Sequence, residues 1–219
     1  MTFRTSGAWD AFHFKSGNLA ARLHVEVHDF NLDFPGSVQM MGALWIEAFP
    51  GWNTDGLVTV ALDNVDVFGG KNAVFVPSGR TMLYADDLRI FGNVGTNTET
   101  EHGTYINGAL LTHFDSSSWT GQRANGVDGG HQLKNKALIQ IYEDVSVDNR
   151  AGASDPSNRV LMDLTGLGYI WAEGIDLTRV ETADPREGLI HLRSQGRTRY
   201  IPSEVYPAEP VQVLSLIHI

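Results

Sequence analysis

The sequence contains no cysteine, which excludes disulfide bonds, a thiolate nucleophile and any metal site built on cysteine. It also has no apolar run of the roughly 18 residues that a membrane-spanning helix needs. Basic residues are few, because 16 Lys and Arg stand against 26 Asp and Glu, for a net charge of −10. Such an acidic chain has no general attraction to a polyanion. We therefore expect neither a nucleic-acid partner nor a membrane span.

Several sequence motifs of known chemistry are also missing. The chain has no Gly-rich phosphate loop, no nucleophile elbow and no His-Glu-x-x-His zinc motif. The first ten residues are polar and contain no apolar core of a signal peptide. What is present is a hydrophobic fraction of 42% together with 23 glycines. This composition supports a buried core built from many short strands and turns.

One pattern recurs along the chain: an alternating apolar segment, an acidic or small polar residue, and then an apolar-x-apolar triplet. Its six copies occupy residues 23–32, 58–67, 83–90, 112–119, 141–147 and 170–177. The equivalent positions 30, 65, 88, 117, 145 and 175 are separated by 35, 23, 29, 28 and 30 residues. A period of this size corresponds to one supersecondary unit per repeat.

The repeats predict an all-β fold, a right-handed parallel β-helix in the form of a single-stranded solenoid. Their local period is two rather than 3.6, and β-branched and aromatic residues fill them. The variable spacing is tolerated in a solenoid because loops bulge outward from a constant stack of strands. A β-sandwich is the alternative, but it gives no reason for the same acidic corner to recur in five of six units.

The pattern also predicts which side chains point inward and form columns along one axis. These are Val25, Val27, Phe30, Val60, Leu62, Val65, Val67, Leu83, Leu88, Ile90, Phe114, Trp119, Val145, Val147, Ile175 and Leu177. Trp119 is assigned to the core because it aligns with Leu32, Val67, Ile90, Val147 and Leu177.

The last six residues, Leu214 to Ile219, are the translation of a transposon end used in preparing sequencing libraries. We therefore expect residues 214–219 to be adapter sequence and not native. Residues 1–213 are then a β-helix fragment of about six to eight coils. It would be incomplete at its C-terminus, and its N-terminus is also open to question.

Two short segments carry residue types with chemical potential. His102 and Tyr105 are each followed 29 residues later, by His131 and Lys134 respectively. This offset matches the spacings of 29 and 28 between adjacent repeats, and equivalent residues of neighbouring strands lie about 4.8 Å apart. We therefore expect Tyr105 beside Lys134, and His102 beside His131.

Alternation along the strands assigns a face to each of these residues. If Ile106 and Leu133 point inward, His102 and His131 lie on the same interior side. The outward and exposed residues are then Tyr105, Asn107, Lys134 and Lys136.

These residues suit the handling of a uronate polymer. An ammonium group neutralises a uronate carboxylate, and a Lys with a lowered pKa or a Tyr can abstract the proton on the adjacent carbon. The candidate catalytic residues are Lys134, Tyr105, His131 and His102, and the candidate substrate-binding residues are Asn107, Lys136 and Trp52. The alternative is a solvated outer face with the two histidines as hydrogen-bonded interior residues.

Trp52 is included because it lies in the turn-rich loop 50–56, and sugar C–H faces stack on exposed aromatic rings. Local packing is the alternative for such a residue. The acidic corner residues Asp63, Asp86, Asp115, Glu143 and Glu173 allow a paired-carboxylate glycosidase or a calcium site. Turn chemistry explains them equally, since carboxylates bond local backbone N–H groups. No ligand loop of known spacing is present, so no metal or other cofactor is expected.

Residues 93–192 resemble a bacterial group of right-handed β-helix repeat proteins in the pectate-lyase-like superfamily. The similar pieces are His102-Gly-Thr-Tyr105, then Gly130-His131-Gln-Leu-Lys134-Asn-Lys136-Ala137, then Ala151-Gly-Ala-Ser154 and Asp163-Leu164. This chain has Asn135-Lys136 where the group usually has Ser-Arg. The resemblance covers less than half of the chain, and it implies a fold more directly than a reaction.

Two functions are compatible with this resemblance. One is a carbohydrate-active β-helix that binds a polysaccharide and cleaves it, as a lyase or a glycoside hydrolase, if it is an enzyme at all. The other is a non-catalytic structural or adhesive solenoid, such as a surface protein or phage tail-spike body. Both imply an extracellular location or one on a cell or virion surface. Fold alone does not separate them.

Overall fold

The computed structural model describes twelve stretches of the chain. They are residues 2–4, 12–16, 22–34, 42–48, 56–69, 72–77, 79–91, 102–120, 131–148, 161–166, 169–178 and 190–194. Trp52 and residues 214–219 lie outside these stretches. Within them every regular element is a β-strand, so the all-β prediction is confirmed for the part of the chain that the structure describes.

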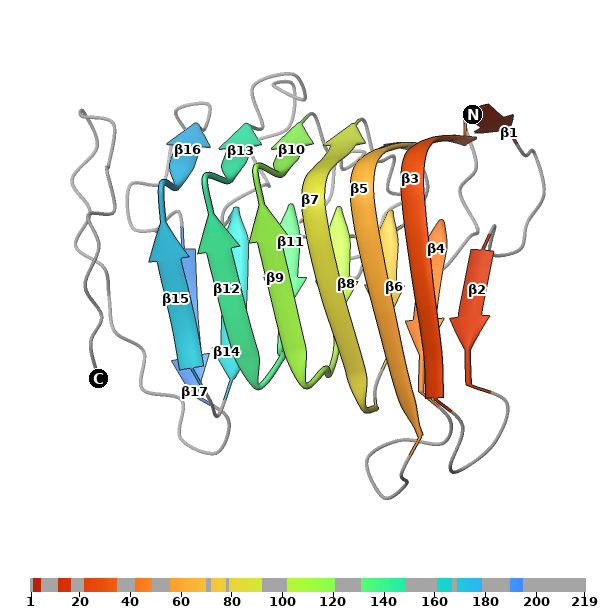
Figure 1. Ribbon diagram of the computed structural model, residues 1–219. Coiled ribbons are helices and arrows are strands. Elements are labelled where there is room, and N and C mark those ends of the chain that lie inside the picture. The colour runs from red at the N-terminus through yellow and green to blue at the C-terminus, as the bar shows by residue number, and fades with distance from the viewer. Residues whose placement is uncertain are drawn as a thin grey trace.

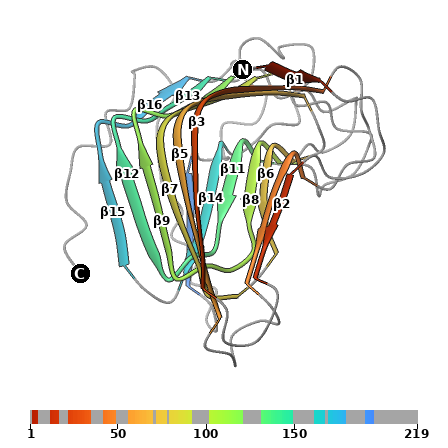
Figure 2. The ribbon, with the colours of Figure 1, turned by 45° about the vertical axis from the view of Figure 1, so that its right-hand side comes forward.

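The strands form two sheets that face each other (Figures 1 and 2). Sheet A contains β1 (Thr2–Arg4), β3 (Arg22–Phe34), β5 (Leu57–Gly69), β7 (Thr81–Phe91), β9 (Leu111–Asp115), β10 (Ser118–Thr120), β12 (Ile139–Glu143), β13 (Ser146–Asp148), β15 (Tyr169–Glu173) and β16 (Asp176–Thr178). Sheet B contains β2 (Phe12–Lys15), β4 (Leu44–Glu47), β6 (Val74–Val76), β8 (Thr104–Ile106), β11 (Leu133–Asn135), β14 (Met162–Gly166) and β17 (Ile190–Ser194).

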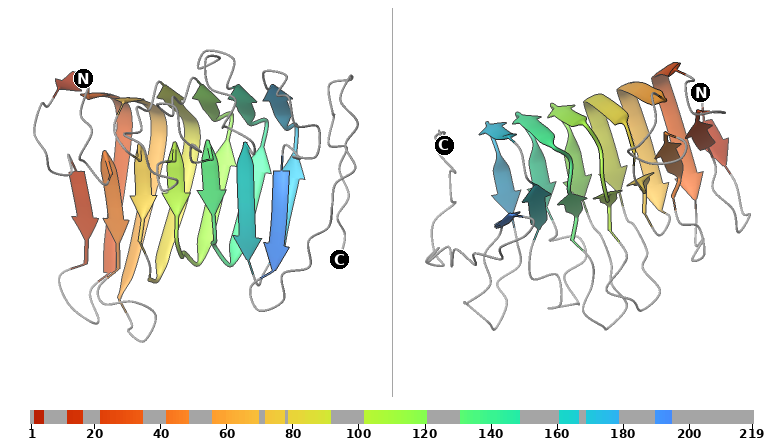
Figure 3. Two further views of the ribbon diagram at one scale, coloured as in Figure 1. Left: turned by 180° about the vertical axis from the view of Figure 1, so that it is seen from behind. Right: turned by 90° about the horizontal axis from the view of Figure 1, so that it is seen from below.

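From β2 onward the chain passes alternately through sheet B and sheet A, and each passage lies beside the previous one (Figure 3). We call one passage through both sheets a circuit. Every strand pairing among the described residues is parallel; for example, β5 pairs with β3 and β7. A β-sandwich of antiparallel strands is therefore excluded for this part of the chain.

A sharp bend divides the sheet A part of each circuit. The bend residue has a positive φ of 49–65° in six consecutive circuits, at Asp29, Asn64, Asp87, Ser116, Asp144 and Gly174. Asn, Asp and Gly adopt this left-handed conformation most readily. At Gly174 a side chain would also collide with Asp144 of the preceding circuit. Each bend from Asn64 onward directly follows one of the acidic corner residues, which the strand register aligns in a column from Asp63 to Glu173.

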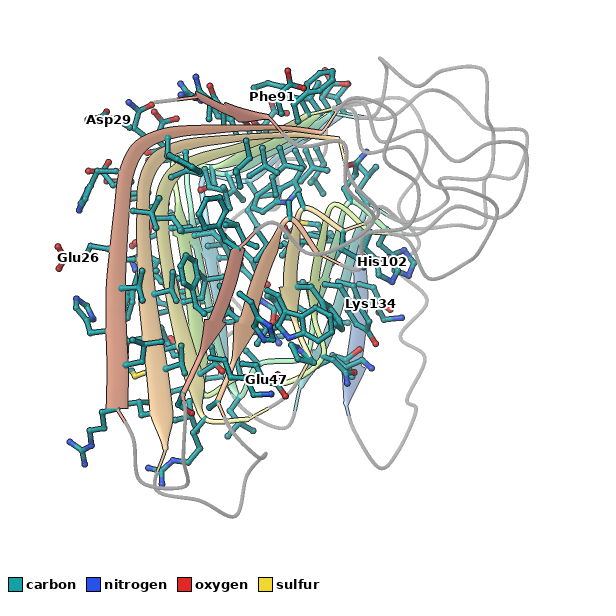
Figure 4. All side chains as sticks on the ribbon, turned by 90° about the vertical axis from the view of Figure 1, so that its right-hand side faces the viewer. Glu26, Asp29, Glu47, Phe91, His102 and Lys134 are labelled. Carbon is teal, nitrogen blue, oxygen red and sulfur yellow. The ribbon has the colours of Figure 1, made fainter. Side chains whose placement is uncertain are left out.

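The core lies between the two sheets, as the stick view along the stack shows (Figure 4). The predicted inward residues are confirmed, since each is buried or packs against the buried cluster. They form columns through the register, and one column is Leu32, Val67, Ile90, Trp119, Val147 and Leu177. The buried indole of Trp119 donates a hydrogen bond to Thr104 Oγ1 at 2.9 Å, as a buried Trp N–H requires.

Replacing Val65 with Ala should lower the free energy of unfolding by about 1–3 kcal/mol, because its side chain is fully buried. Chemical denaturation of the purified chain measures this change. Phe68→Ala is the control, since Phe68 lies on the same strand but points outward. We expect a change within about 0.5 kcal/mol there. Equal losses at the two positions would contradict the assignment of faces.

Candidate functional site

The outer face of sheet B brings Tyr105 and Lys134 together. Tyr105 on β8 is paired in register with Lys134 on β11, as the shared 29-residue offset predicts. The Lys134 Nζ atom lies 5.7 Å from the centroid of the Tyr105 ring, and Lys136 Nζ lies 5.5 Å from the same centroid. Both ammonium groups are within the range of cation–π attraction to one ring.

Asn107 links the hydroxyl and ammonium groups of this cluster. Tyr105 donates its hydroxyl hydrogen to Asn107 Oδ1 at 3.0 Å, and Lys136 Nζ donates to the same oxygen at 2.8 Å. Lys136 also contacts the Tyr105 hydroxyl at 3.4 Å. The side-chain Nδ2 of Asn107 donates to the carbonyl of Pro77 in the previous circuit at 2.9 Å. The predicted proximity of Tyr105, Asn107, Lys134 and Lys136 is therefore confirmed.

A buried carboxylate, Asp163 on β14, supports the cluster from the next circuit. Its side chain is 1% exposed, and its Oδ2 lies 3.3 Å from His131 Nε2 and 3.6 Å from Lys134 Nζ. Lys134 itself is 23% exposed, so our expectation of an exposed lysine is wrong. The same 29-residue offset that leads from Tyr105 to Lys134 leads on to Asp163. Extending the offset by one repeat would have identified Asp163 from the sequence.

The two histidines lie with this cluster and not between the two sheets, although His102 is only 1% exposed. Their rings stack at 5.5 Å with 5° between the planes, which confirms that His102 lies beside His131. However, the His102 ring also contacts the Tyr105 ring at 4.9 Å, and Figure 4 places His102 near Lys134 on the outer side of sheet B. The predicted interior side is therefore wrong, whereas the expected burial and hydrogen bonding of His102 are confirmed. Both histidines precede their strands, where strict alternation does not apply.

Close backbone approach fixes the two histidines against each other. The His131 amide donates to His102 Nδ1 at 2.9 Å, and the His102 amide donates to Asn72 Oδ1 at 2.9 Å. A Cβ at Gly103 would lie 2.5 Å from the Gln132 carbonyl oxygen. The position directly after His102 must therefore be glycine for the two circuits to approach each other this closely.

Burial lowers the pKa of His102 well below its ordinary value of 6.5, and the nearby charges of His131 and Lys134 act in the same direction. Asp163 opposes them without reversing the effect. His102 is therefore neutral at neutral pH, with Nδ1 accepting the hydrogen bond from His131. In this state it orients its neighbours without adding charge.

Asn135 holds the two lysines on the outer face. It lies between them on β11, points inward and is fully buried. Its amide nitrogen donates to Thr112 Oγ1 and to the Tyr142 hydroxyl, both at 2.7 Å. Its oxygen accepts the Ala137 amide at 2.9 Å. A buried amide with these partners fixes the end of the strand and so the direction of both ammonium groups.

A second group of polar residues lies on sheet A. His113 Nε2 is 2.6 Å from Glu143 Oε2, and with Asp115 these residues offer three ligand atoms within 4.8 Å of one another. This is the single set among the described residues that combines three His or carboxylate ligands in this way. The short His113–Glu143 contact is a hydrogen bond between the imidazole and the carboxylate. Three of the acidic corner residues hydrogen-bond to side chains, Asp63 to His28, Asp115 to Ser116 and Glu143 to His113.

Comparison with known proteins gives no relative: no family model, no curated protein and no solved structure matches this chain. The described residues contain no helix long and apolar enough to cross a membrane.

The lowered pKa of His102 predicts how the folding stability changes with pH. The unfolded chain binds a proton below about pH 6.5 that the folded chain does not bind, so His102 lowers folding stability as the pH falls. His102→Gln keeps an acceptor for the His131 amide and removes this effect. Compared with the unaltered chain, the variant should therefore gain relative stability from about pH 7 to about pH 5. Denaturation curves across this range measure it.

His28→Gln is the matched comparison, because its effect on stability should change with pH in the opposite direction. Asp63, followed by Glu26, raises the pKa of His28 through hydrogen bonds. His28 therefore stabilises the fold below about pH 6.5, and this contribution disappears as the pH rises through the folded pKa. Its variant should lose relative stability on acidification. Parallel pH profiles for the two variants would contradict both assignments.

Proposed function

We propose that the chain is part of a right-handed parallel β-helix that binds an acidic polysaccharide on the outer face of sheet B. The observation that carries this proposal is the placement of two lysine ammonium groups around the single ring of Tyr105. An aromatic ring offers an apolar platform for the C–H face of a sugar. The ammonium groups beside it are suited to the carboxylate of a uronate.

The architecture supports the β-helix part of this proposal. The chain alternates between two parallel sheets, and each circuit stacks on the previous one with side chains in register. The strands follow one another at unequal intervals along the sequence, yet the columns keep their register, which is typical of β-solenoids. The resemblance to pectate-lyase-like repeat proteins around Tyr105 and Lys134 favours the same fold.

Cleavage by β-elimination is a chemistry that this site could perform. A base removes the proton from the carbon next to the uronate carboxylate, a double bond forms between that carbon and its ring neighbour, and the bond from this neighbour to the glycosidic oxygen breaks. The leaving oxygen takes up a proton from the protonated base or from water. Tyr105 is the better candidate for the proton transfer, because Lys134 is engaged by the buried Asp163. Lys134 would then contact the substrate carboxylate, where an ammonium stabilises the charge that develops during proton removal.

A non-catalytic structural or adhesive solenoid is the second candidate. It is favoured by the observation that both ammonium groups have partners within the protein, with Lys134 Nζ 3.6 Å from Asp163 Oδ2 and Lys136 Nζ hydrogen-bonded to Asn107 Oδ1. Such a surface is stable without a ligand. In either case we propose an extracellular location, or one on a cell or virion surface, where a polysaccharide partner is available.

Lys134→Met should weaken binding of a uronate polymer at least tenfold, about 1.4 kcal/mol, because it removes the positive charge and keeps most of the aliphatic side chain. Isothermal titration with polygalacturonate and with alginate measures the affinity. A melting curve of the variant is needed alongside, since the change also removes one partner of the buried Asp163. Unchanged affinity in a folded variant would contradict the site.

Tyr105→Phe separates binding from cleavage. The variant keeps the ring and loses the hydroxyl that contacts Asn107 and Lys136. An enzyme should retain affinity and lose at least 100-fold in rate, as expected for removal of an acid–base group. Tyr84→Phe, on sheet A, is the matched control. Absorbance of the unsaturated product measures the rate, and no product from the unaltered chain on either polymer would favour the non-catalytic candidate.

A further inference from the structure

An aromatic column crosses the strands of sheet B. Trp45, Phe75 and Tyr105 occupy the same register position on β4, β6 and β8, and Lys134 occupies it on β11. The ring centroids of Trp45 and Phe75 are 4.9 Å apart, and those of Phe75 and Tyr105 are 5.5 Å apart. We call these three residues the aromatic column. It starts beside the lysine cluster and runs toward the first circuits of the chain.

The three rings differ in exposure. Phe75 is 7% exposed and packs edge-on against Trp45, with 85° between the ring planes. Trp45 and Tyr105 are both half-buried. Phe75 therefore acts as a spacer, and the two partly exposed rings are separated by two strand spacings, or about 10 Å.

Charge is divided between the two sheets. All three lysines in the described stretches, Lys15, Lys134 and Lys136, lie on or directly after strands of sheet B. Most described carboxylates lie on sheet A or at its bends, including Glu26, Asp29, Asp63, Asp66, Asp86, Asp87, Asp115, Glu143, Asp144, Glu173 and Asp176. Four described arginines, Arg4, Arg22, Arg80 and Arg89, also lie on or directly before strands of sheet A, but the carboxylates there outnumber them. In a chain with a net charge of −10, this excess of carboxylates repels an anionic polymer from sheet A and leaves the sheet B face as its docking surface.

We propose that the acidic polysaccharide crosses the strands and lies along the stacking direction, from Lys134 over Tyr105 to Trp45. This inference rests on the proposed function and adds a second subsite at Trp45. A polymer running along a strand would find little surface, because β8 and β11 have only three residues each. Across the strands, by contrast, one register position provides a cation and two partly exposed aromatic rings.

The spacing of the column fits a linear sugar chain. Lys134 and Trp45 are separated by three strand spacings of about 4.8 Å, or about 14 Å in all. One strand spacing is close to the length of one pyranose unit in an extended 1,4-linked polymer. In a polymer with two-fold screw symmetry, alternate units present the same face. Tyr105 and Trp45 would therefore stack on alternate units, and four units would span the surface.

Titration of the unaltered chain with 1,4-linked uronate oligomers of two to six units tests this arrangement. Affinity should rise at least tenfold from the dimer to the tetramer and then level off. Trp45→Ala should leave dimer binding unchanged and weaken tetramer binding about five- to tenfold, as expected for the loss of one aromatic contact. Trp45→Phe, which keeps a ring in the same place, should give a smaller loss and covers the case in which the Ala variant does not fold.

Trp171→Ala is the matched control, because Trp171 is an exposed tryptophan on sheet A, away from the column. It should leave every affinity unchanged. Neutral glucose oligomers of the same lengths and linkage should bind at least tenfold more weakly than the uronates, and equal binding would overturn the choice of an acidic ligand. Affinity that does not depend on length, or an equal loss at all lengths in both Trp45 variants, would overturn the proposed orientation alone. No binding of any oligomer would overturn the proposed function and this inference together.

Discussion

The parallel register between successive circuits is the constraint on which the rest of the structure depends. Each circuit hydrogen-bonds to its neighbours through the backbone, including the positions beside the bends, where the Ser116 amide donates to the Glu143 carbonyl and the Asp144 amide to the Glu173 carbonyl. Because the strands are parallel and in register, every side chain lies directly beside its counterpart in the next circuit. A core residue therefore packs against its counterparts in the circuits on both sides, and these residues together form a column.

The candidate site is a consequence of the same constraint. Tyr105, Lys134 and Asp163 come from three strands distant in sequence, yet one register position brings them side by side. The order of these three residues across the strands matters chemically, because Lys134 lies between the Tyr105 ring and the buried carboxylate of Asp163. The inward Asn135 fixes this geometry through Thr112 and Tyr142, so the core of one circuit directly supports the surface that carries the charges.

Much of this could be predicted from the sequence because register is periodic. The inward columns, the pairing of Tyr105 with Lys134 and the proximity of His102 to His131 all follow from equal offsets. The faces of the histidines could not be predicted, because they precede their strands and alternation holds only within a strand. The partial burial of Lys134 depends on Asp163. The 29-residue offset identifies Asp163, but its apolar neighbours in the sequence give no sign of a buried carboxylate. Trp52 lies outside the described residues and stays a prediction.

The excess of carboxylates on sheet A and the lysines on sheet B give the described part of the chain a dipole perpendicular to its stacking direction. Near a positively charged surface, such as an anion-exchange resin or an aminated support, the acidic bends of sheet A would face the surface. The lysines of sheet B would then point toward the solution. Adsorption would therefore orient the chain uniformly and leave Tyr105 and Lys134 accessible, without any engineered point of attachment.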